Sequence, residues 1–108
     1  HAAAVYGSHY ELLTISEDVG RHNALDKSVG KLLLSDGLSQ AAFLVLSSRI
    51  SFELVQKAAR AHIPMIISVS RPTAFAVKLA SKLNMTLACL AKGSGFYVFC
   101  GHHRLTDS

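Results

Sequence analysis

Short apolar runs alternate with amphipathic stretches in the second half of the chain, and this alternation limits the folds open to it. The apolar runs cover residues 41–46, 65–69 and 85–90, and they suit strands buried on both faces of a sheet. Stretches with helical periodicity separate them at residues 51–61 and 73–83. Strands and helices in this order predict parallel pairing with right-handed crossovers. We therefore expect an α/β fold with a mixed, largely parallel sheet.

The first half of the chain predicts a hairpin followed by one helix. Residues 3–6 and 10–15 have the composition of strands, joined across Gly7-Ser8-His9. Asn23 is expected to cap the helix that follows. The residues predicted to face inward are Leu25, Val29, Leu32 and Leu33 in this helix, and Phe52, Val55, Ala58 and Ala59 in the next. Further turns are predicted at Asp36-Gly37, where the first helix ends, and at Gly93-Ser94-Gly95, before a last strand at residues 96–99.

Length and composition indicate a single domain over residues 1–108. Half of the residues are hydrophobic and 17% are charged, which fits a chain with a buried core. The longest apolar runs are too short to cross a bilayer, and no signal segment opens the chain. We therefore expect a cytoplasmic protein that does not bind membranes. Cys89 and Cys100 lie in apolar surroundings and are predicted to be small core residues, without a disulfide or a metal ion.

The charge balance weakly favours an anionic partner. The net charge is +4 and the isoelectric point is about 9.3. The lysines and arginines are scattered rather than gathered with aromatic residues, so nucleic acid is not expected as a partner. The pair His102-His103 lacks further ligands nearby and is predicted to be a solvated tail rather than a zinc site.

A faint repeat with an offset of 22 residues links two of the predicted strand–helix units. Ser48-Arg49 corresponds to Ser70-Arg71, and Ser51 corresponds to Thr73. Each copy places a serine and an arginine just after a strand, with a hydroxyl at the start of the next helix. Helix capping is one explanation, because hydroxyl side chains are favoured at that position. Capping does not call for arginine twice.

The two Ser-Arg pairs indicate a binding site for phosphate groups. In an open parallel sheet, ligands bind outside the carboxyl ends of the strands. The amino ends of the following helices present free N–H groups and a partial positive charge there, and guanidinium groups bind phosphate oxygens in a forked geometry. No Walker A or Gly-x-Gly-x-x-Gly motif accompanies them. The residues assigned to phosphate contact are Ser48, Arg49, Ser51, Ser70, Arg71 and Thr73.

The segment Glu17-Asp18-Val19-Gly20-Arg21-His22-Asn23 carries more polar chemistry than a connector needs. It links a predicted strand to a helix start, so it should lie at the same edge. Arg21 either pairs with a carboxylate inside the loop or contacts a ligand. Both interpretations stay open: a turn that satisfies its own charges, and a pocket wall in which Arg21 and His22 touch ligand.

Several stretches together resemble the formate dehydrogenase accessory sulfurtransferase family, FdhD/NarQ. They are HAAA at the start, EDVGRHNALDK, SSRISFELVQKAARAHIP, SVSRPTAFAVKLA and GFYVFCG, at residues 1–4, 17–27, 47–64, 68–80 and 95–101. The resemblance covers nearly the whole chain in order, and the second and third stretches are long and specific.

The resemblance implies a fold, an activity and partners. The fold is a three-layer α/β domain similar to cytidine deaminases, without their zinc site. Members carry sulfur from a cysteine desulfurase to the Mo-bis(molybdopterin guanine dinucleotide) cofactor of formate dehydrogenase, or to its tungsten analogue, and form homodimers. GDP is then the expected surrogate for the cofactor. The segment that binds cofactor in the family corresponds to Phe96, Tyr97, Val98, Phe99, Cys100 and Gly101.

One family feature is absent from this sequence. The persulfide-forming cysteine of the family belongs to a C-x-x-C motif upstream of the histidine that matches His1, and no C-x-x-C occurs here. Cys100 stands where relatives are expected to carry Thr or Ser, so it is not assigned as a nucleophile. We therefore expect the carboxy-terminal core of a longer sulfurtransferase, without a catalytic residue of its own. A non-catalytic guanine-nucleotide-binding chaperone and a purely structural or docking domain are the alternatives.

Overall fold

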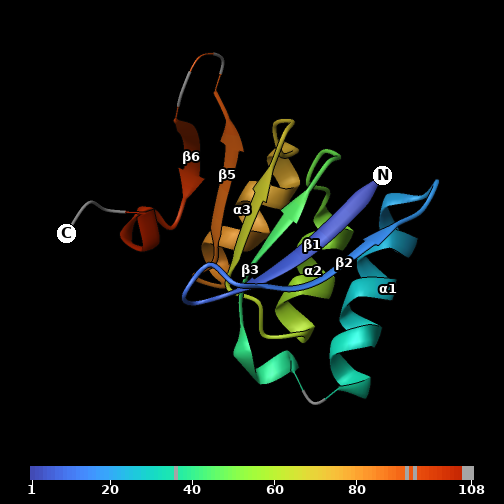
Figure 1. Cartoon of the computed structure of the whole chain (residues 1–108). Coiled ribbons are helices and arrows are strands. Elements are labelled where there is room, and N and C mark those ends of the chain that lie inside the picture. The colour runs from blue at the N-terminus through green and yellow to red at the C-terminus, as the bar shows by residue number, and fades with distance from the viewer. Residues whose placement is uncertain (36, 92, 94, 106–108) are drawn as a thin grey trace.

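Six strands form one mixed sheet in the computed structural model, which describes residues 1–35, 37–91, 93 and 95–105 (Figure 1). The elements in chain order are β1 (Ala2–Gly7), β2 (Leu12–Glu17), α1 (Arg21–Leu34), η1 (Leu38–Gln40), β3 (Ala41–Leu46), α2 (Phe52–Arg60), β4 (Met65–Ser68), α3 (Ala74–Lys82), β5 (Thr86–Leu90), β6 (Phe96–Cys100) and η2 (His102–Leu105), where η marks a short 3₁₀ helix. Asp36 and Ser94, at which turns were predicted, lie outside the described residues.

The strand order is β2-β1-β3-β4-β5-β6. β3, β4 and β5 are parallel neighbours, as the sequence pattern predicts. β1 is antiparallel to both β2 and β3, and β6 is antiparallel to β5. β2 therefore runs in the same direction as β3, β4 and β5. The expected α/β fold with a mixed sheet is confirmed.

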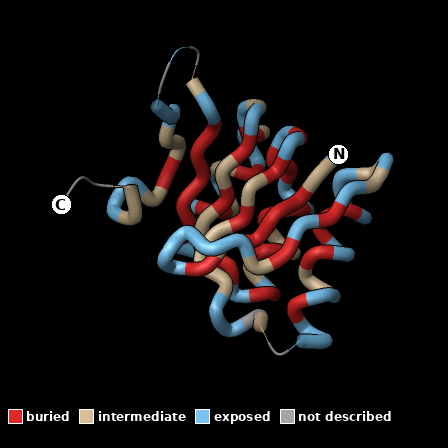
Figure 2. Tube along the Cα trace, in the orientation of Figure 1, coloured by how far each residue is buried: buried red, intermediate tan, exposed pale blue. Residues whose placement is uncertain are grey.

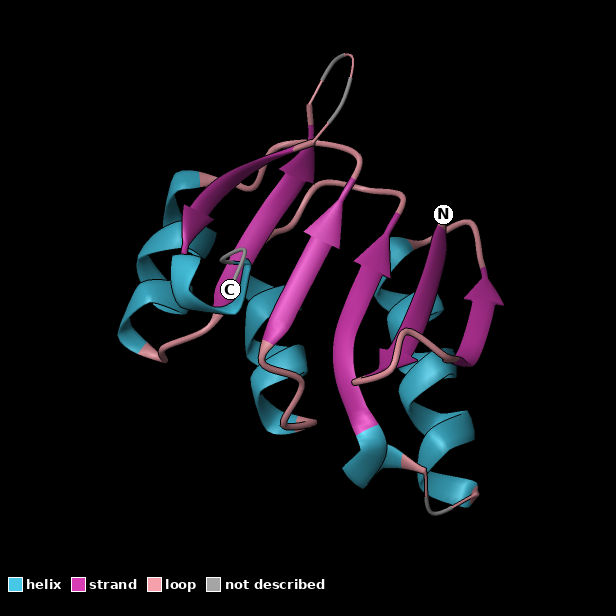
Figure 3. Ribbon diagram, turned by 60° about the vertical axis from the view of Figure 1, so that its left-hand side comes forward, coloured by secondary structure: helices cyan, strands magenta, loops and turns pink. Residues whose placement is uncertain are grey.

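All three α-helices lie on the same face of the sheet (Figure 3). From β2 onward the chain advances across the sheet in one direction, so crossovers of one hand keep every helix on one side. The expectation that the apolar strands are buried on both faces is therefore wrong for β3 and β4. It holds for β5, in which residues 86–89 are all buried. In β3, Leu44 and Leu46 face the helices and are buried, whereas Phe43 and Val45 point to the other face and are only half-buried.

The core lies between the sheet and the helices (Figure 2). Val5, Leu44, Ile66 and Leu87 follow one another across four strands in register and are fully inaccessible to solvent. Burying a side chain of this size contributes roughly 1.5–3 kcal/mol. The helices cover this row with the buried residues Ala24, Leu25, Leu32, Leu54, Val55, Ala58, Ala76 and Ala80.

The start of α1 differs from the prediction. The helix begins at Arg21, and Gly20 occupies the N-cap position without a side-chain cap. Asn23 therefore lies inside the first turn and is not the cap. The small residue Ser28 faces the sheet and donates its hydroxyl to the carbonyl oxygen of Ala3 at 2.7 Å, which fixes the rotation of the helix. Leu33, predicted to face inward, is 59% exposed in consequence.

The hairpin turn is longer than predicted, so β2 starts two residues later than expected. The N–H of Gly7 donates to the carbonyl oxygen of Glu11 at 2.9 Å, which closes the turn. Tyr10 lies in this turn with a φ angle of 64°, a left-handed conformation that bulky residues seldom adopt.

Phe52, at the first position of α2, was predicted to face the core but is 37% exposed, and Leu54 is the buried residue of this first turn. Among the described residues no helix has the length and apolar character needed to span a bilayer.

Candidate functional site

The carboxyl ends of β2, β3, β4 and β5 meet at one edge of the sheet, at the top of Figure 3. Hydrogen bonds tie the loops of this edge together. The N–H of Ala2 donates to Ser47 Oγ at 2.7 Å, and the N–H of Asp18 donates to the carbonyl oxygen of His1 at 2.9 Å. The N–H of Thr73 donates to the carbonyl oxygen of Ile50 at 3.0 Å. The edge is therefore one continuous surface, and it includes the segments that carry Arg21, Arg49 and Arg71.

Arg49 and Arg71 are linked at this edge. The Nε–H of Arg49 donates to the backbone carbonyl oxygen of Arg71 at 3.2 Å. The guanidinium carbon of Arg71 lies 5.5 Å from the centroid of the Tyr97 ring, within the range of a cation–π contact. Both arginines are exposed, and neither forms an ion pair with a carboxylate in the described part of the chain. Their charge is available to an anionic ligand.

The hydroxyl groups at the edge mainly serve the protein itself. Ser51 Oγ accepts the N–H of Leu54 at 3.3 Å, and Thr73 Oγ1 accepts the N–H of Ala76 at 3.1 Å, so both residues are helix caps. Each hydroxyl keeps one O–H donor for a ligand. Ser48 is buried and donates to the carbonyl oxygen of Arg49 at 3.2 Å. Ser70 is half-buried, and its carbonyl oxygen accepts the hydroxyl of Ser68.

The polar segment before α1 is organised around Asp18. Its Oδ2 lies 2.7 Å from Lys27 Nζ, and its Oδ1 accepts the N–H of Gly20 at 3.1 Å. The hydrogen bond from Lys27, followed by that from Gly20, lowers the pKa of Asp18 from 3.8 to about 2. Arg21 is exposed and forms no ion pair within the described residues, and His22 is half-buried. The turn thus satisfies its carboxylate through Lys27 and leaves Arg21 outside.

The segment that corresponds to the family's cofactor-binding stretch forms β6, the last strand of the sheet, and the glycine that follows it. Its start is at the arginine edge, where Phe96 and Tyr97 pair with Leu90 and Cys89. Its end is at the opposite edge, where Cys100 is buried and its Sγ lies 3.5 Å from the carbonyl oxygen of Met85. Only the first residues of the stretch, of which Tyr97 contacts Arg71, are therefore near the arginines.

The remaining residues of that stretch have structural surroundings. Val98 is half-buried, and Phe99 packs against the core. Gly101 has a φ angle of 67°, and a Cβ atom there would lie 2.5 Å from the carbonyl oxygen of Met85. The backbone of this turn permits only glycine. A ligand that contacts both ends of β6 would have to extend along the whole length of this strand.

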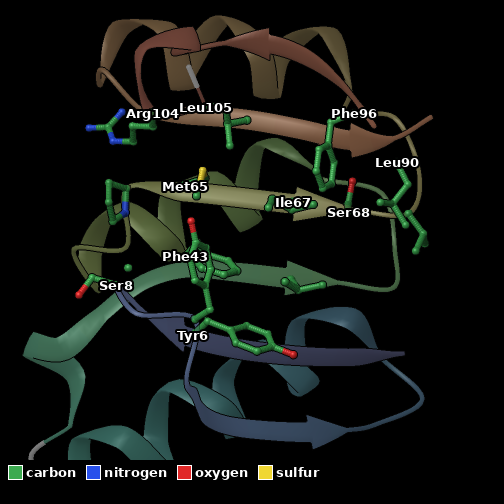
Figure 4. A pocket seen from close by; sticks show the side chains of 15 residues that line it. Tyr6, Ser8, Phe43, Met65, Ile67, Ser68, Leu90, Phe96, Arg104 and Leu105 are labelled. Carbon is green, nitrogen blue, oxygen red and sulfur yellow. The ribbon is translucent and has the colours of Figure 1, made fainter. Parts of the chain in front are cut away.

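A groove that the sequence did not predict lies on the face of the sheet opposite the helices (Figure 4). It is an apolar groove of about 790 Å³. At one end the rings of Tyr6 and Phe43 stack with centroids 5.1 Å apart, and Phe96 lies at the other end. The sequence feature that could have predicted this groove is the apolar residues at alternate positions of β3 and β4, on the face opposite the helices. The groove also includes Met65, Ile67, Val69, Leu90 and Leu105, with Ser8, Ser68 and Arg104 among its polar members.

The fold and the arginine edge define an α/β domain suited to an anionic ligand beyond the carboxyl ends of its strands. The model of the FdhD/NarQ family matches residues 1–106. The chain therefore belongs to the FdhD/NarQ family, as the sequence motifs predict.

Individual relatives agree with this assignment. The chain is 46% identical over 106 residues to the sulfur carrier protein FdhD of Streptomyces avermitilis and 41% identical over 105 residues to that of Thermoplasma volcanium. Each match covers 97% of this chain and 38% of the relative. The crystal structure of a formate dehydrogenase accessory protein from Desulfotalea psychrophila matches with a TM-score of 0.84 and 31% identity, over 95% of this chain and 46% of that one. The chain thus spans less than half the length of each of these relatives.

Proposed function

We propose that this chain is the cofactor-holding part of a sulfur carrier protein that serves formate dehydrogenase. In the complete protein, a cysteine takes sulfur from a cysteine desulfurase as a persulfide. The S–S bond of the persulfide would then break. The terminal sulfur would pass to the metal of a bound Mo- or W-bis(molybdopterin guanine dinucleotide), which is the client, while the cysteine leaves as a thiolate and the client metal supplies the two electrons that turn the sulfur into a sulfide. The described part of this chain holds the nucleotide portion of that client. The persulfide cysteine is assigned to sequence that the longer relatives have and this chain does not.

The link between Arg49 and Arg71 is the observation that carries the proposal. Two exposed guanidinium groups on neighbouring loops, without a carboxylate partner among the described residues, are complementary to the two phosphates of a guanine nucleotide. The amino ends of α2 and α3 add partial positive charge at the same edge. A fixed nucleotide would hold the distant metal in place. Correct placement of reacting groups can lower the activation barrier by roughly 7–11 kcal/mol.

Calorimetric titration with GDP and GMP tests the assignment of the diphosphate. GDP should bind at least about tenfold more tightly than GMP at low salt, because only GDP offers a phosphate to each arginine. Inorganic pyrophosphate should compete with GDP. Equal affinities for GDP and GMP would show that the two arginines do not bind one phosphate each.

The alternative is a chaperone that binds the cofactor without transferring sulfur. The burial of both cysteines favours this for the chain by itself, since Cys89 is 2% exposed and Cys100 is 7% exposed. Incubation of the full-length protein with a cysteine desulfurase and labelled cysteine separates the two. Sulfur label on the protein indicates a sulfurtransferase, and its absence with intact GDP binding indicates a chaperone.

A homodimer in the cytoplasm is part of both proposals. A stable dimer that binds no guanine nucleotide would instead indicate a structural or docking domain.

A further inference from the structure

Two cationic side chains lie close to Asp18 in the sequence, and its carboxylate forms an ion pair with one of them. Arg21 is three residues away, and Lys27 is nine residues away, on the second turn of α1. Lys27 Nζ lies 2.7 Å from Asp18 Oδ2 and 3.4 Å from the carbonyl oxygen of Glu17. The N–H of Gly20 occupies Oδ1. Both carboxylate oxygens are thus engaged, and neither by Arg21.

This choice of partner decides the state of Arg21. A guanidinium group binds a carboxylate with two parallel hydrogen bonds, so a free Asp18 would be a strong competitor for it. The Asp18 side chain is only 17% exposed, whereas the Lys27 side chain is 54% exposed. The lysine therefore covers a sheltered negative charge that would otherwise face the start of α1. Arg21 is left at the first helical position, exposed and without an ion pair in the described ranges.

We propose that Lys27 and Asp18 form a positioning clamp, in which Lys27 keeps Asp18 away from Arg21 so that the Arg21 guanidinium is available to the guanine nucleotide as a third cationic contact, beside Arg49 and Arg71. This inference rests on the proposed function. Neither clamp residue touches the ligand. Lys27 acts in two ways: it prevents an ion pair that would occupy Arg21, and it neutralises a carboxylate that would repel the phosphates.

Both effects require the negative charge of Asp18, and this makes the clamp testable by rescue. The Lys27→Met variant should bind GDP about tenfold more weakly than the wild type at low salt. Adding Asp18→Asn to it should restore the affinity to within about threefold of the wild type, because no carboxylate remains to capture Arg21. Lys31→Met is the matched control. It removes the same charge one turn further along, from a lysine that donates to the carbonyl oxygen of Ile15 at 2.9 Å, and it should leave the affinity unchanged.

A purely structural pair predicts a different pattern. The double variant would then bind as weakly as Lys27→Met, and that result would overturn the clamp, as would unchanged affinity in Lys27→Met. Circular dichroism checks that each variant is folded. Should Lys27→Met fail to fold, Asp18→Asn alone decides the matter: the clamp predicts binding at least as tight as in the wild type, and weaker binding contradicts it.

A measurement without ligand separates failure of the clamp from failure of the proposed function. The Nε–H signal of Arg21 in NMR spectra should exchange more slowly with water in Lys27→Met than in the wild type, because a new ion pair protects it. The signal should return to wild-type behaviour in the double variant. Identical Arg21 exchange in all three proteins overturns the clamp even if GDP binds. Absence of GDP binding to the wild type, with the exchange pattern as expected, removes the nucleotide site and leaves the choice of partner established.

Discussion

The side chain of Arg49 holds the backbone of Arg71, through a hydrogen bond of 3.2 Å from Nε–H to the carbonyl oxygen. The two residues are 22 positions apart and follow neighbouring parallel strands. Because Arg71 also lies against the ring of Tyr97, the loops after β3 and β4 and the start of β6 form one connected unit. Arg49 therefore has a structural role beside any contact with ligand.

Replacing Arg49 by alanine should weaken GDP binding by about 1.5–3 kcal/mol, the range for a lost hydrogen bond to a charged group. This corresponds to a roughly ten- to 150-fold rise in Kd, measured by calorimetry. Arg60→Ala is the control, because Arg60 lies in the last turn of α2, at the far end from the capped start. Equal affinity of the Arg49 and Arg60 variants would remove Arg49 from the site.

Acid should destabilise the protein partly through Asp18. The folded pKa of about 2 lies below the ordinary value of 3.8, so the folded state favours the ionised carboxylate. Its contribution to stability is complete above about pH 4 and is lost as the pH falls through about 2. The melting temperature of the wild type should therefore decrease more steeply between pH 4 and pH 2 than that of Asp18→Asn. Parallel curves for the two proteins would contradict the assigned pKa.

Two neighbouring isoleucines of β4 should differ sharply in their contribution to stability. Ile66 faces the helices and is fully buried, whereas Ile67 lines the groove on the other face and is half-buried. Ile66→Ala should cost about 2–5 kcal/mol of unfolding free energy, the range for a large side chain removed from a core. Ile67→Ala should cost well under half of that. Urea denaturation measures both, and equal losses would indicate that the groove face is covered in solution.

Gly101 should be essential for folding rather than for ligand contact. Its left-handed φ angle and the 2.5 Å approach to the carbonyl oxygen of Met85 leave no space for a Cβ atom. Gly101→Ala should cost about 2–5 kcal/mol, the sum of backbone strain and overpacking. Gly93→Ala is a matched control, since Gly93 also has a positive φ angle, of 94°, but nothing within 4 Å of the added atom. Similar losses for the two variants would show that crowding at Gly101 is unimportant.

The sequence by itself determined the order of strands and helices and the hydroxyl caps of α2 and α3. These features depend on residue types a few positions apart, so local periodicity and side-chain chemistry are enough to predict them. The sequence also placed both Ser-Arg pairs at the ends of parallel strands, as observed. The same local reasoning wrongly predicted Asn23 as the N-cap of α1. The position of this helix depends on the contact between Ser28 and Ala3, which are 25 residues apart and so give no local signal.

Only the tertiary structure decided which charged groups pair and which stay free. The sequence offered Arg21 to Asp18, but the helix brings Lys27 back to the carboxylate and leaves Arg21 exposed. The packing of every helix on one face likewise left the other face of the sheet as an open apolar groove. Such outcomes depend on distances between residues remote in sequence, and those distances are set by the direction of the crossovers and by packing, not by neighbouring residues.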